Sequence, residues 1–284
     1  MNGVDSGPNC QNTEATYGKC SSGRLSESKT AWDDLGRMDP LWSILTAEGK
    51  RYGKWEIENF FRSGEEDVNA LLSKATALGY PKRKETALDF GCGVGRLTRA
   101  LGQHFEKCWG VDIAESMINH AMELNRDHKN LHFQVNDRED LSVFRDCAFD
   151  IVTSILTLQH VPRRCTIEAY ITDFVRIVRE GGIVVFQLPT YVPLIWLQNI
   201  RSKAYYLLRK VGFKPTVLYE TLRLVPMENT YIKRGEVLRL VNSSGGTVLH
   251  LEEHRTSGTF PWRVGTYYVT KKSEETHVAQ IHRH

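Results

Sequence analysis

The feature that most constrains the fold of this chain is the alternation of short apolar segments with amphipathic segments over residues 83–190. Short apolar runs bounded by glycine or polar residues are typical of buried strands, and the segments between them have the spacing of helices with one apolar face. Buried strands that alternate with helices predict a mostly parallel sheet covered on both faces. The chain is therefore expected to form a doubly wound α/β domain.

This pattern predicts seven strands and four helices in the core. The strands are expected at Thr86–Phe90, Cys108–Ile113, Leu131–Val135, Phe149–Leu158, Ile183–Leu188, Thr247–Glu252 and Gly265–Thr270. The helices are expected at Arg96–His104, Ser116–Asn125, Thr166–Arg179 and Gly235–Asn242. The pair Gly181–Gly182 is predicted to end the third helix, because glycine readily adopts the positive φ of a helix C-cap.

Changes in composition divide the chain into six segments. Its beginning is rich in Ser, Gly, Asn and Thr, which is typical of disorder, and helical spacing follows. The predicted segments are a disordered tail at 1–30, an N-terminal helical cap at 31–82, a ligand-binding core at 83–190, an insertion or lid at 191–232, the final helix and strands of the core at 233–272, and a tail at 273–284.

The overall composition is that of a globular protein and argues against several kinds of partner. Of the 284 residues 41% are apolar and 25% charged, and the net charge of +3 is too small to indicate binding to nucleic acid. No basic start followed by an apolar stretch marks a secretory signal. The six cysteines form no C-x-x-C pair and no set with histidine at metal-ligand spacing, which predicts free thiols, no metal and a cytoplasmic setting.

A glycine-rich turn, in the stretch LDFGCGVGRL, follows the first predicted strand. Gly91, Gly93 and Gly95 stand at alternate positions in it. In an open parallel sheet, ligands bind beyond the carboxyl ends of the strands, and a turn without side chains lets a ligand approach the backbone. A turn of this kind can also exist for packing alone, so the glycines leave both interpretations open.

Two acidic residues beside the turn favour a cationic nucleoside ligand. Asp112 ends the second strand, where a carboxylate can accept hydrogen bonds from both ribose hydroxyls, although a solvated strand-end Asp is the alternative. Asp89 precedes the turn, and a carboxylate there repels a pyrophosphate and attracts a cation. The spacing G-x-G-x-G also departs from the G-x-G-x-x-G of dinucleotide sites, whose third glycine position holds Arg96 here.

At this point the sequence resembles the class I S-adenosylmethionine-dependent methyltransferases of the small-molecule type. Five motifs carry the resemblance in order: LDFGCGVGRL, GVDIAESMI, VNDREDL, FDIVTSILTLQHV and RIVREGGIVVFQLP. The resemblance implies a Rossmann-like, seven-stranded sheet and S-adenosyl-L-methionine as cofactor. Two departures from the family pattern are visible: Asn136 stands where Gly is frequent, and Gln159–His160 where His-His is frequent.

The resemblance also implies roles for single residues. Asp89 and the backbone of the glycine turn, including Cys92, are expected to surround the methionyl part of the cofactor, and the carbonyl of Ser154 its ammonium. Asp112 is expected to bind the ribose. The expected adenine contacts are Ile113 and Met117 against the ring, Asp137 at its amino group and the backbone of Arg138 facing it.

Three further residues are candidates for chemistry or for the cofactor's methionyl end. Methyl transfer from a sulfonium needs an in-line nucleophile and exclusion of water, with a base only where the nucleophile has a proton to lose. His160, just beyond the fourth strand, is the candidate base, and a packing role is the alternative. In the segment 49–61, Arg51 is a candidate partner of the cofactor carboxylate and Tyr52 an aromatic that can face the sulfonium; the alternative is an amphipathic helix packed on the sheet.

Residues 191–212 combine apolar and aromatic side chains with Arg201, Lys203, Arg209 and Lys210. We interpret them as a lid over a small-molecule acceptor rather than as a membrane-surface helix, because four charges attract anionic lipid only modestly. Nucleic-acid methyltransferases of this fold carry an Asn/Asp-Pro-Pro-aromatic motif where this chain has SILT (154–157), so nucleic acid is not expected. The expected function is methyl transfer to a small molecule. The alternatives are a nicotinamide-dependent oxidoreductase and a non-catalytic regulatory protein that binds S-adenosylmethionine.

Overall fold

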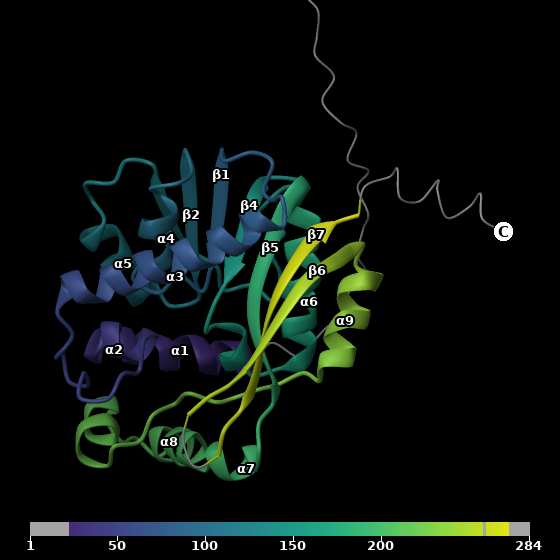
Figure 1. Cartoon of the computed structure of the whole chain (residues 1–284). Coiled ribbons are helices and arrows are strands. Elements are labelled where there is room, and N and C mark those ends of the chain that lie inside the picture. Colours follow the sequence, from purple (N-terminus) through teal and green to yellow (C-terminus); the bar gives the residue numbers. More distant parts are fainter. Residues whose placement is uncertain (1–22, 258–259, 273–284) are drawn as a thin grey trace, which may run out of the picture.

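A seven-stranded sheet forms the centre of the structure, a computed structural model that describes residues 23–257 and 260–272. The strands are β1 (Thr86–Phe90), β2 (Lys107–Asp112), β3 (Leu131–Val135), β4 (Phe149–Ser154), β5 (Val178–Tyr191), β6 (Gly246–Arg255) and β7 (Arg263–Lys271). Their order is β3-β2-β1-β4-β5-β7-β6, and only the pairs that involve β7 are antiparallel (Figure 1). The predicted doubly wound, mostly parallel sheet is confirmed.

The winding of the chain reverses between β1 and β4, which pair with each other although two strands separate them in the sequence. Right-handed crossovers therefore place the helices that follow β1 and β2 on one face of the sheet and the helix that follows β4 on the other. Ligand sites in such sheets lie at this reversal, beyond the carboxyl ends of the strands.

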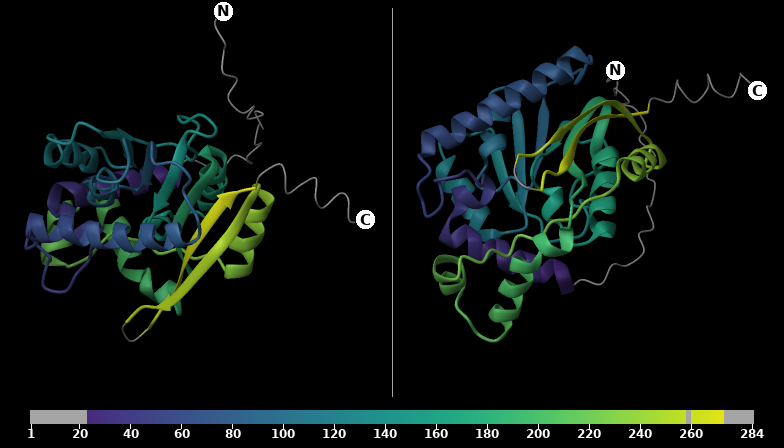
Figure 2. Two further views of the ribbon diagram at one scale, coloured as in Figure 1. Left: turned by 45° about the horizontal axis from the view of Figure 1, so that its top comes forward. Right: turned by 60° about the horizontal axis from the view of Figure 1, so that its bottom comes forward.

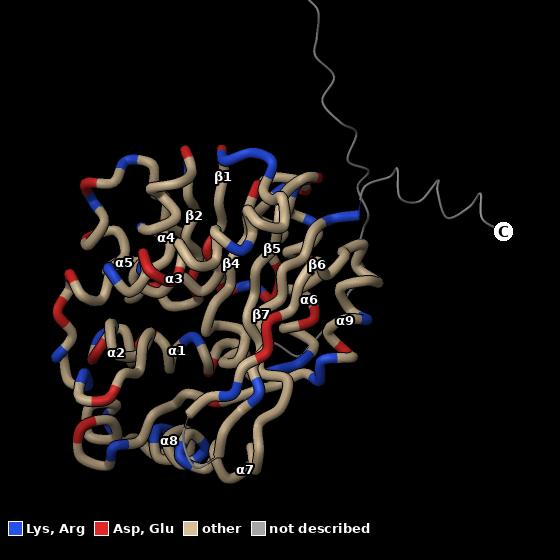
Figure 3. The backbone as a smooth tube through the Cα atoms, viewed as in Figure 1, with Lys and Arg blue, Asp and Glu red and all other residues tan. Residues whose placement is uncertain are grey.

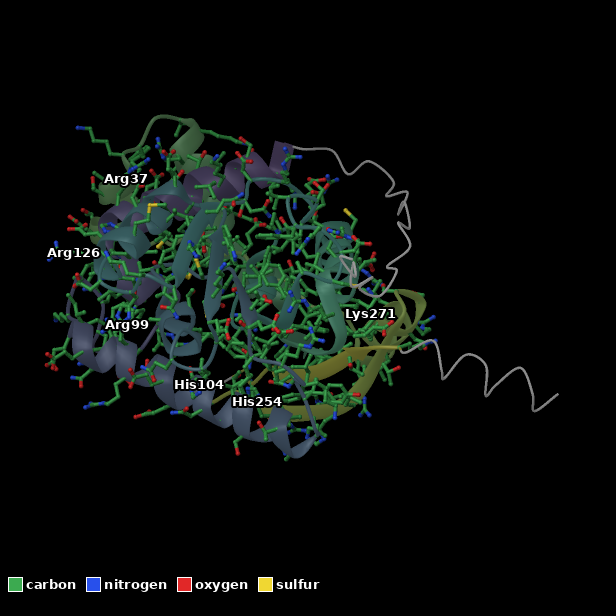
Figure 4. The ribbon with its side chains drawn as sticks, turned by 90° about the horizontal axis from the view of Figure 1, so that it is seen from above. Arg37, Arg99, His104, Arg126, His254 and Lys271 are labelled. Carbon is green, nitrogen blue, oxygen red and sulfur yellow. The ribbon has the colours of Figure 1, made fainter. Side chains whose placement is uncertain are left out.

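Helices cover both faces of the sheet and the carboxyl ends of its strands. They are α1 (Gly23–Met38), α2 (Pro40–Ile44), α3 (Ile57–Ala77), α4 (Arg96–Leu101), α5 (Glu115–Leu124), η1 (Leu158–His160), α6 (Arg164–Ile177), α7 (Ile195–Gln198), α8 (Ile200–Lys210), η2 (Val217–Thr221) and α9 (Arg234–Ser243). One apolar cluster joins α3 and α4 to the sheet, and another joins α6 and α9 to the opposite face (Figure 2). Arg99 of α4, labelled in Figure 4, lies 4.5 Å from the centre of the Phe61 ring of α3.

Of the helices at the N-terminal side of the core, α1 and α2 lie at the carboxyl ends of the strands, whereas α3 packs on a face of the sheet (Figure 1). Figure 1 shows α1 and α2 between the sheet and α8, so these helices separate the core from the insertion. Residues 23–30 belong to α1, and the prediction of a disordered tail at 1–30 is wrong for them. Leu25 and Leu35 are buried, and they anchor the helix despite its polar composition. Residues 1–22 and 273–284, the remaining predicted tails, lie outside the described residues.

The glycine pair after α6 does not form the predicted helix cap. The helix ends at Ile177, and β5 begins at once with Val178. The pairing of β4 with β5 then jumps from Phe149↔Val178 to Ile151↔Ile183, so the glycines lie in a bulge. Gly181 has φ 74° there, and this conformation rather than a cap accounts for the glycine.

The cysteines differ from the prediction of free thiols. Cys147 and Cys165 are disulfide-bonded, whereas Cys92 and Cys108 are buried free thiols. The prediction is thus wrong for two cysteines, and cysteine usage no longer argues for a reducing compartment. Cys10 and Cys20 lie outside the described residues. In the part of the chain that the structure describes, no helix combines the length and apolarity needed to cross a bilayer.

Candidate functional site

A cavity opens where the winding reverses, at the carboxyl ends of β1 and β4. Its walls come from the turn after β1, the ends of β2 and β4, and the helices α1 and α2. Its empty volume, counted out to open solvent, is about 970 Å³, within the usual range of small-molecule sites. We call it the inner cavity.

The glycine turn lines the inner cavity with backbone atoms. Gly91 and Gly93 have φ of 75° and 53°, in the left-handed region. A Cβ atom on Gly91 would lie 2.0 Å from Cγ2 of Thr157, and one on Gly93 would lie 2.4 Å from Cδ1 of Ile44. Other side chains thus pack directly on this backbone, and only glycine fits. Gly95 caps α4 and is not part of the cavity lining.

Asp112 reaches from the end of β2 to the glycine turn. Its Oδ2 accepts the backbone N–H of Gly93 at 2.9 Å, and its Oδ1 accepts that of Ala114 at 2.9 Å. Burial raises the pKa of the carboxyl, and these backbone bonds oppose the shift. Each oxygen keeps a lone pair, so the carboxylate can still accept hydrogen bonds from a ligand in the cavity.

Asp89 supplies a second carboxylate to the lining. It is 2% exposed, and its oxygens accept the hydroxyls of Thr98 at 2.7 Å and Thr153 at 3.3 Å. Burial raises its pKa to about 6, so the group is charged at neutral pH at a cost in stability. Arg96 is also among the lining residues, but its guanidinium is paired with Asp67 of α3 at 2.7 Å. The cavity therefore favours a cationic ligand.

The apolar wall of the cavity contains three of the predicted residues. Cys92, Ile113 and Met117 line it, and Met117 is almost fully buried. Burial raises the pKa of the Cys92 thiol well above its usual value, which keeps it neutral. Such a wall suits a flat apolar ring.

The structure places Asn136 rather than Asp137 in the lining. Asn136 is buried and its amide donates to the carbonyl of Asp140 at 3.2 Å. Asp137 is 56% exposed and lies 2.8 Å from Nζ of Lys29. The carbonyl of Arg138 accepts the hydroxyl of Tyr170, and neither Asp137 nor Arg138 lines the inner cavity.

The segment after β4 forms the part of the wall that packs against the glycine turn, where the hydroxyl of Thr157 donates to the carbonyl of Gly91 at 3.3 Å. Ser154 itself is fully buried, and its hydroxyl has no hydrogen-bond partner among the described residues. The next three residues, Ile155–Thr157, reach the cavity, and Leu156 has a φ of 61°, unusual for a side chain of its size.

His160 lines the inner cavity, and each nitrogen of its ring has a hydrogen-bond partner. Its Nδ1 is 3.0 Å from the carbonyl of Glu228, and its Nε2 is 3.0 Å from the amide nitrogen of Gln159. Burial lowers its pKa, so the ring is neutral at neutral pH. Because a carbonyl only accepts, Nδ1 carries the proton, and Nε2 accepts from Gln159. The edge of the ring also packs on Trp32, with centroids 5.5 Å apart.

The structure does not bring Arg51 and Tyr52 to the inner cavity. The guanidinium of Arg51 lies 4.2 to 5.0 Å from the rings of Trp42, Tyr52 and Tyr219 and donates to the carbonyl of Tyr219 at 3.1 Å. The backbone N–H of Tyr52 donates to Asp39 at 2.5 Å, and its side chain is exposed. Only residues 49–56 of the segment form a loop, whereas residues 57–61 begin α3 and bury Phe60 and Phe61, as the packed-helix alternative predicts for them.

Sequence reasoning missed the contribution of α1 and α2. The inner cavity is lined by Leu25, Ser28 and Trp32 of α1 and by Ile44 of α2, and not by Arg51 and Tyr52. The three α1 residues are spaced as one helical face, and this periodicity was the available signal. The polar residues around Leu25 concealed it.

A second pocket lies beyond His160. It shares Ser43, Ile44, Leu156 and His160 with the inner cavity, and its empty volume out to open solvent is about 1300 Å³. We call it the outer pocket. Its remaining wall belongs largely to the insertion and to Trp262, whose Nε1 donates to Gln198 at 2.8 Å. Arg51, Arg201 and Arg223 line it, and among the residues that the structure describes no Asp or Glu does.

No metal site accompanies these pockets in the described part of the chain, where His, Cys, Asp and Glu form no group able to hold an ion. The arrangement is therefore one of two adjoining pockets, an inner one with buried carboxylates and an outer one with arginines and aromatic rings.

The core of the chain is similar in sequence to known methyltransferases. Residues 88–186 match the family model of the methyltransferase domain. The chain is 27% identical over 166 residues to 2-methyl-6-phytyl-1,4-hydroquinone methyltransferase of Synechocystis, covering 58% of this chain and 51% of the relative. It is 26% identical over 196 residues to the ubiquinone biosynthesis O-methyltransferase of Thiobacillus denitrificans, covering 67% and 76%. The chain thus spans about half the length of the first relative.

Solved structures agree on the fold. Magnesium protoporphyrin IX methyltransferase from Synechocystis with bound S-adenosylmethionine superposes with a TM-score of 0.55 at 16% identity, over 90% of this chain and 100% of that one. A methyltransferase from Leishmania major gives 0.56 at 11% identity, over 87% and 83%. These likenesses confirm the predicted Rossmann-like methyltransferase fold.

Proposed function

We propose, on the premise that this chain belongs to the class I S-adenosylmethionine-dependent methyltransferases, that it transfers the methyl group of S-adenosyl-L-methionine to a small molecule. The observation that carries the proposal is the pair of adjoining pockets, which share four residues. The inner cavity holds the carboxylates that suit a sulfonium and an ammonium, and the outer pocket has room for an acceptor. Matches to methyltransferases favour this function over a nicotinamide-dependent oxidoreductase.

The proposed cofactor contacts keep most of the predicted residues. Asp112 would accept from the ribose hydroxyls, and Ile113 and Met117 would flank the adenine. Asp89 with Gly91, Cys92 and Gly93 would surround the methionyl part, whereas Gly95, which caps α4, would only shape the turn. The carbonyl of Ser154 remains the proposed acceptor for the ammonium.

The proposed contacts at the adenine edge need one revision. Asn136 lies in the cavity, whereas Asp137 would reach the adenine amino group, with the backbone of Arg138 facing the ring, only after releasing Lys29. We therefore propose Asn136 as the first polar group at that edge. Arg51 would act at the outer pocket and not at the cofactor carboxylate, because its aromatic partners hold it there, whereas Tyr52 lines neither pocket.

The cofactor supplies an activated methyl group, so the protein mainly positions the acceptor and excludes water. The nucleophile must lie about 3 Å from the methyl carbon, in line with the bond to sulfur. Leu156 and Ile44, shared by both pockets, would keep the junction dry. His160 is neutral and would accept a proton from a hydroxyl or phenol once Gln159 releases its Nε2.

The outer pocket favours an acceptor that combines a ring with negative charge. Trp42 and Trp262 offer apolar faces, and within residues 23–257 and 260–272 the three arginines supply the only formal charges of the lining. One relative is named as a hydroquinone methyltransferase and the other as an O-methyltransferase of ubiquinone biosynthesis, and phenols and quinols are therefore the first acceptors to test.

The proposal is tested by titrating the protein with S-adenosylhomocysteine and, separately, with NAD in a calorimeter, and then by incubation with labelled S-adenosylmethionine and a panel of phenols and quinols. We expect heat with the first ligand alone and label in a small molecule. Tight binding of NAD without S-adenosylhomocysteine binding would overturn the proposal. Binding without transfer to any acceptor would favour the non-catalytic alternative.

A further inference from the structure

The insertion exposes an unusual number of large apolar side chains. Of the fifteen that are exposed in residues 23–257 and 260–272, ten lie between residues 191 and 222. They are Tyr191, Leu194, Trp196, Leu197, Ile200, Leu207, Val211, Phe213, Val217 and Leu222. Folded proteins rarely leave so many together in water, and a patch of this kind marks an interaction surface.

The same segment carries the positive charge of the molecule. Residues 191–223 contain six basic side chains and one acidic side chain, Glu220, whereas the whole chain has a net charge of +3. The positive excess of the chain therefore comes entirely from this segment. Figure 3 shows Lys and Arg gathered around α8. Among the described residues, Arg201, Lys203, Lys214 and Arg223 form no ion pair, so their charges are available to a partner.

Apolar and basic residues alternate along the outer face of α8. Ile200, Lys203, Leu207 and Lys210 are exposed at helical spacing, and Leu207 is 64% exposed. The opposite face packs on α1, where Tyr205 is buried and its hydroxyl lies 3.4 Å from Asp34. The helix is thus fixed to the body by one face and presents the other, with α7 and η2 packed beside it.

We propose that residues 191–223, which we call the insertion lobe, bind the surface of an anionic lipid bilayer. An interfacial helix needs apolar side chains to enter the acyl boundary and basic side chains to meet anionic headgroups, and the outer face of α8 presents both. The sequence alone favoured a lid over a membrane-surface helix. The ten exposed apolar side chains in the structure favour the membrane-surface interpretation instead. Arg201 and Arg223 of the lobe also line the outer pocket, so a hydrophobic acceptor could pass from the bilayer into it.

Vesicle co-sedimentation of the full chain tests the proposal. We expect binding to vesicles of phosphatidylcholine mixed with phosphatidylglycerol, and much weaker binding to phosphatidylcholine alone. Trp196→Ser with Leu207→Ser should weaken binding by at least tenfold. Lys203→Gln with Lys214→Gln should weaken it by about fivefold for each charge removed, and added salt should reduce that difference.

The matched control replaces two exposed apolar residues outside the lobe, Met122→Ser with Val143→Ser, which are 50% and 45% exposed. This control should bind vesicles like the unchanged protein. Equal losses in the control and lobe variants, or no binding to anionic vesicles, would overturn the proposal. A dimer that the lobe variant dissociates, in the absence of vesicle binding, would assign the lobe to a second copy of the chain instead.

Binding of S-adenosylhomocysteine, measured without vesicles, checks that each variant is folded, because none of the four lobe positions lines either pocket of the proposed site. The same measurement keeps failure of lipid binding separate from failure of the methyltransferase proposal.

Discussion

The carboxylate of Asp112 accepts the backbone N–H of Gly93 at 2.9 Å, so the end of β2 and the turn after β1 meet at one point of the inner cavity. The acidic residue thus has two tasks, to shape the glycine turn and to offer its remaining lone pairs to a ligand. Substitution of the Asp112 carboxylate should therefore weaken ligand binding.

Asp112→Asn should weaken binding of S-adenosylhomocysteine by about tenfold to a hundredfold, because hydrogen bonds to a charged group contribute roughly 1.5–3 kcal/mol. An amide NH₂ would also face a backbone N–H of Gly93 or Ala114. Calorimetry gives the affinity. Asp127→Asn, at an exposed position on the surface, is the control and should change nothing. Unchanged affinity in the Asp112 variant would remove the proposed ribose site.

Gly93→Ala should destabilise the fold, for two reasons that can be separated. The left-handed conformation costs roughly 1–2 kcal/mol with a Cβ, and overpacking against Ile44 adds about 1–3 kcal/mol. Combination with Ile44→Ala should relieve the contact but not the conformational strain. Urea unfolding measures both variants.

Gly235→Ala is the matched control for Gly93→Ala, because its φ is not positive and a Cβ there meets nothing within 4 Å. It should not lower the free energy of unfolding. If Gly93→Ala behaved like this control, the close packing of the turn against α2 would be refuted.

Asp89→Asn should stabilise the unliganded protein at neutral pH. The folded pKa of about 6 exceeds the ordinary 3.8, so the folded state binds more protons between these values, and stability from this group falls as pH rises from 4 to 6. A shift of this size corresponds to roughly 3 kcal/mol at pH 7. Unfolding measured at pH 4 and pH 7 should show this slope only in the unchanged protein, while cofactor binding weakens in the variant.

A less stable Asp89 variant with an unchanged pH slope would contradict this account. In that case the buried carboxylate would stabilise the fold, and attraction of a cationic ligand would not be needed to explain it.

His160→Gln should leave the affinity for S-adenosylhomocysteine nearly unchanged and lower kcat by about 10²- to 10⁴-fold if the acceptor loses a proton in the reaction. The pKa of His160 is lowered by burial, so the base form is present at and above pH 6.5, and the rate should decline only below that pH. Steady-state rates across pH check this. A rate that rises with pH above 7 in the unchanged protein would exclude His160 as the base.

The strands were predictable because each combines a short apolar run with a nearby turn. β1 and β3 coincide with their predicted ranges, and the other strands differ at their ends. The end of α6 was not predictable, because β5 begins directly after it and the glycines serve a bulge several residues later. The bulge depends on the register between β4 and β5, which cannot be predicted from the local sequence of either strand.

The inner cavity was predictable where residues follow one another on the core strands, as at Asp89 and Asp112. It was not predictable where tertiary packing decides, as at Arg51, which aromatic rings hold at the outer pocket. Asp137 shows a third limit: its neighbour Asn136 enters the cavity, while an ion pair with Lys29 of a helix predicted as a tail holds Asp137 outside.

The hydrogen bond from Trp262 to Gln198 connects the β6–β7 hairpin to the insertion. The wall that these two segments contribute to the outer pocket therefore comes from residues that follow β5 in the sequence and does not include the glycine turn. This wall can therefore change in evolution without changes in the inner cavity, where the nucleoside is proposed to bind. A chimaera that receives residues 191–262 from a related enzyme should inherit the donor's choice of acceptor along with them.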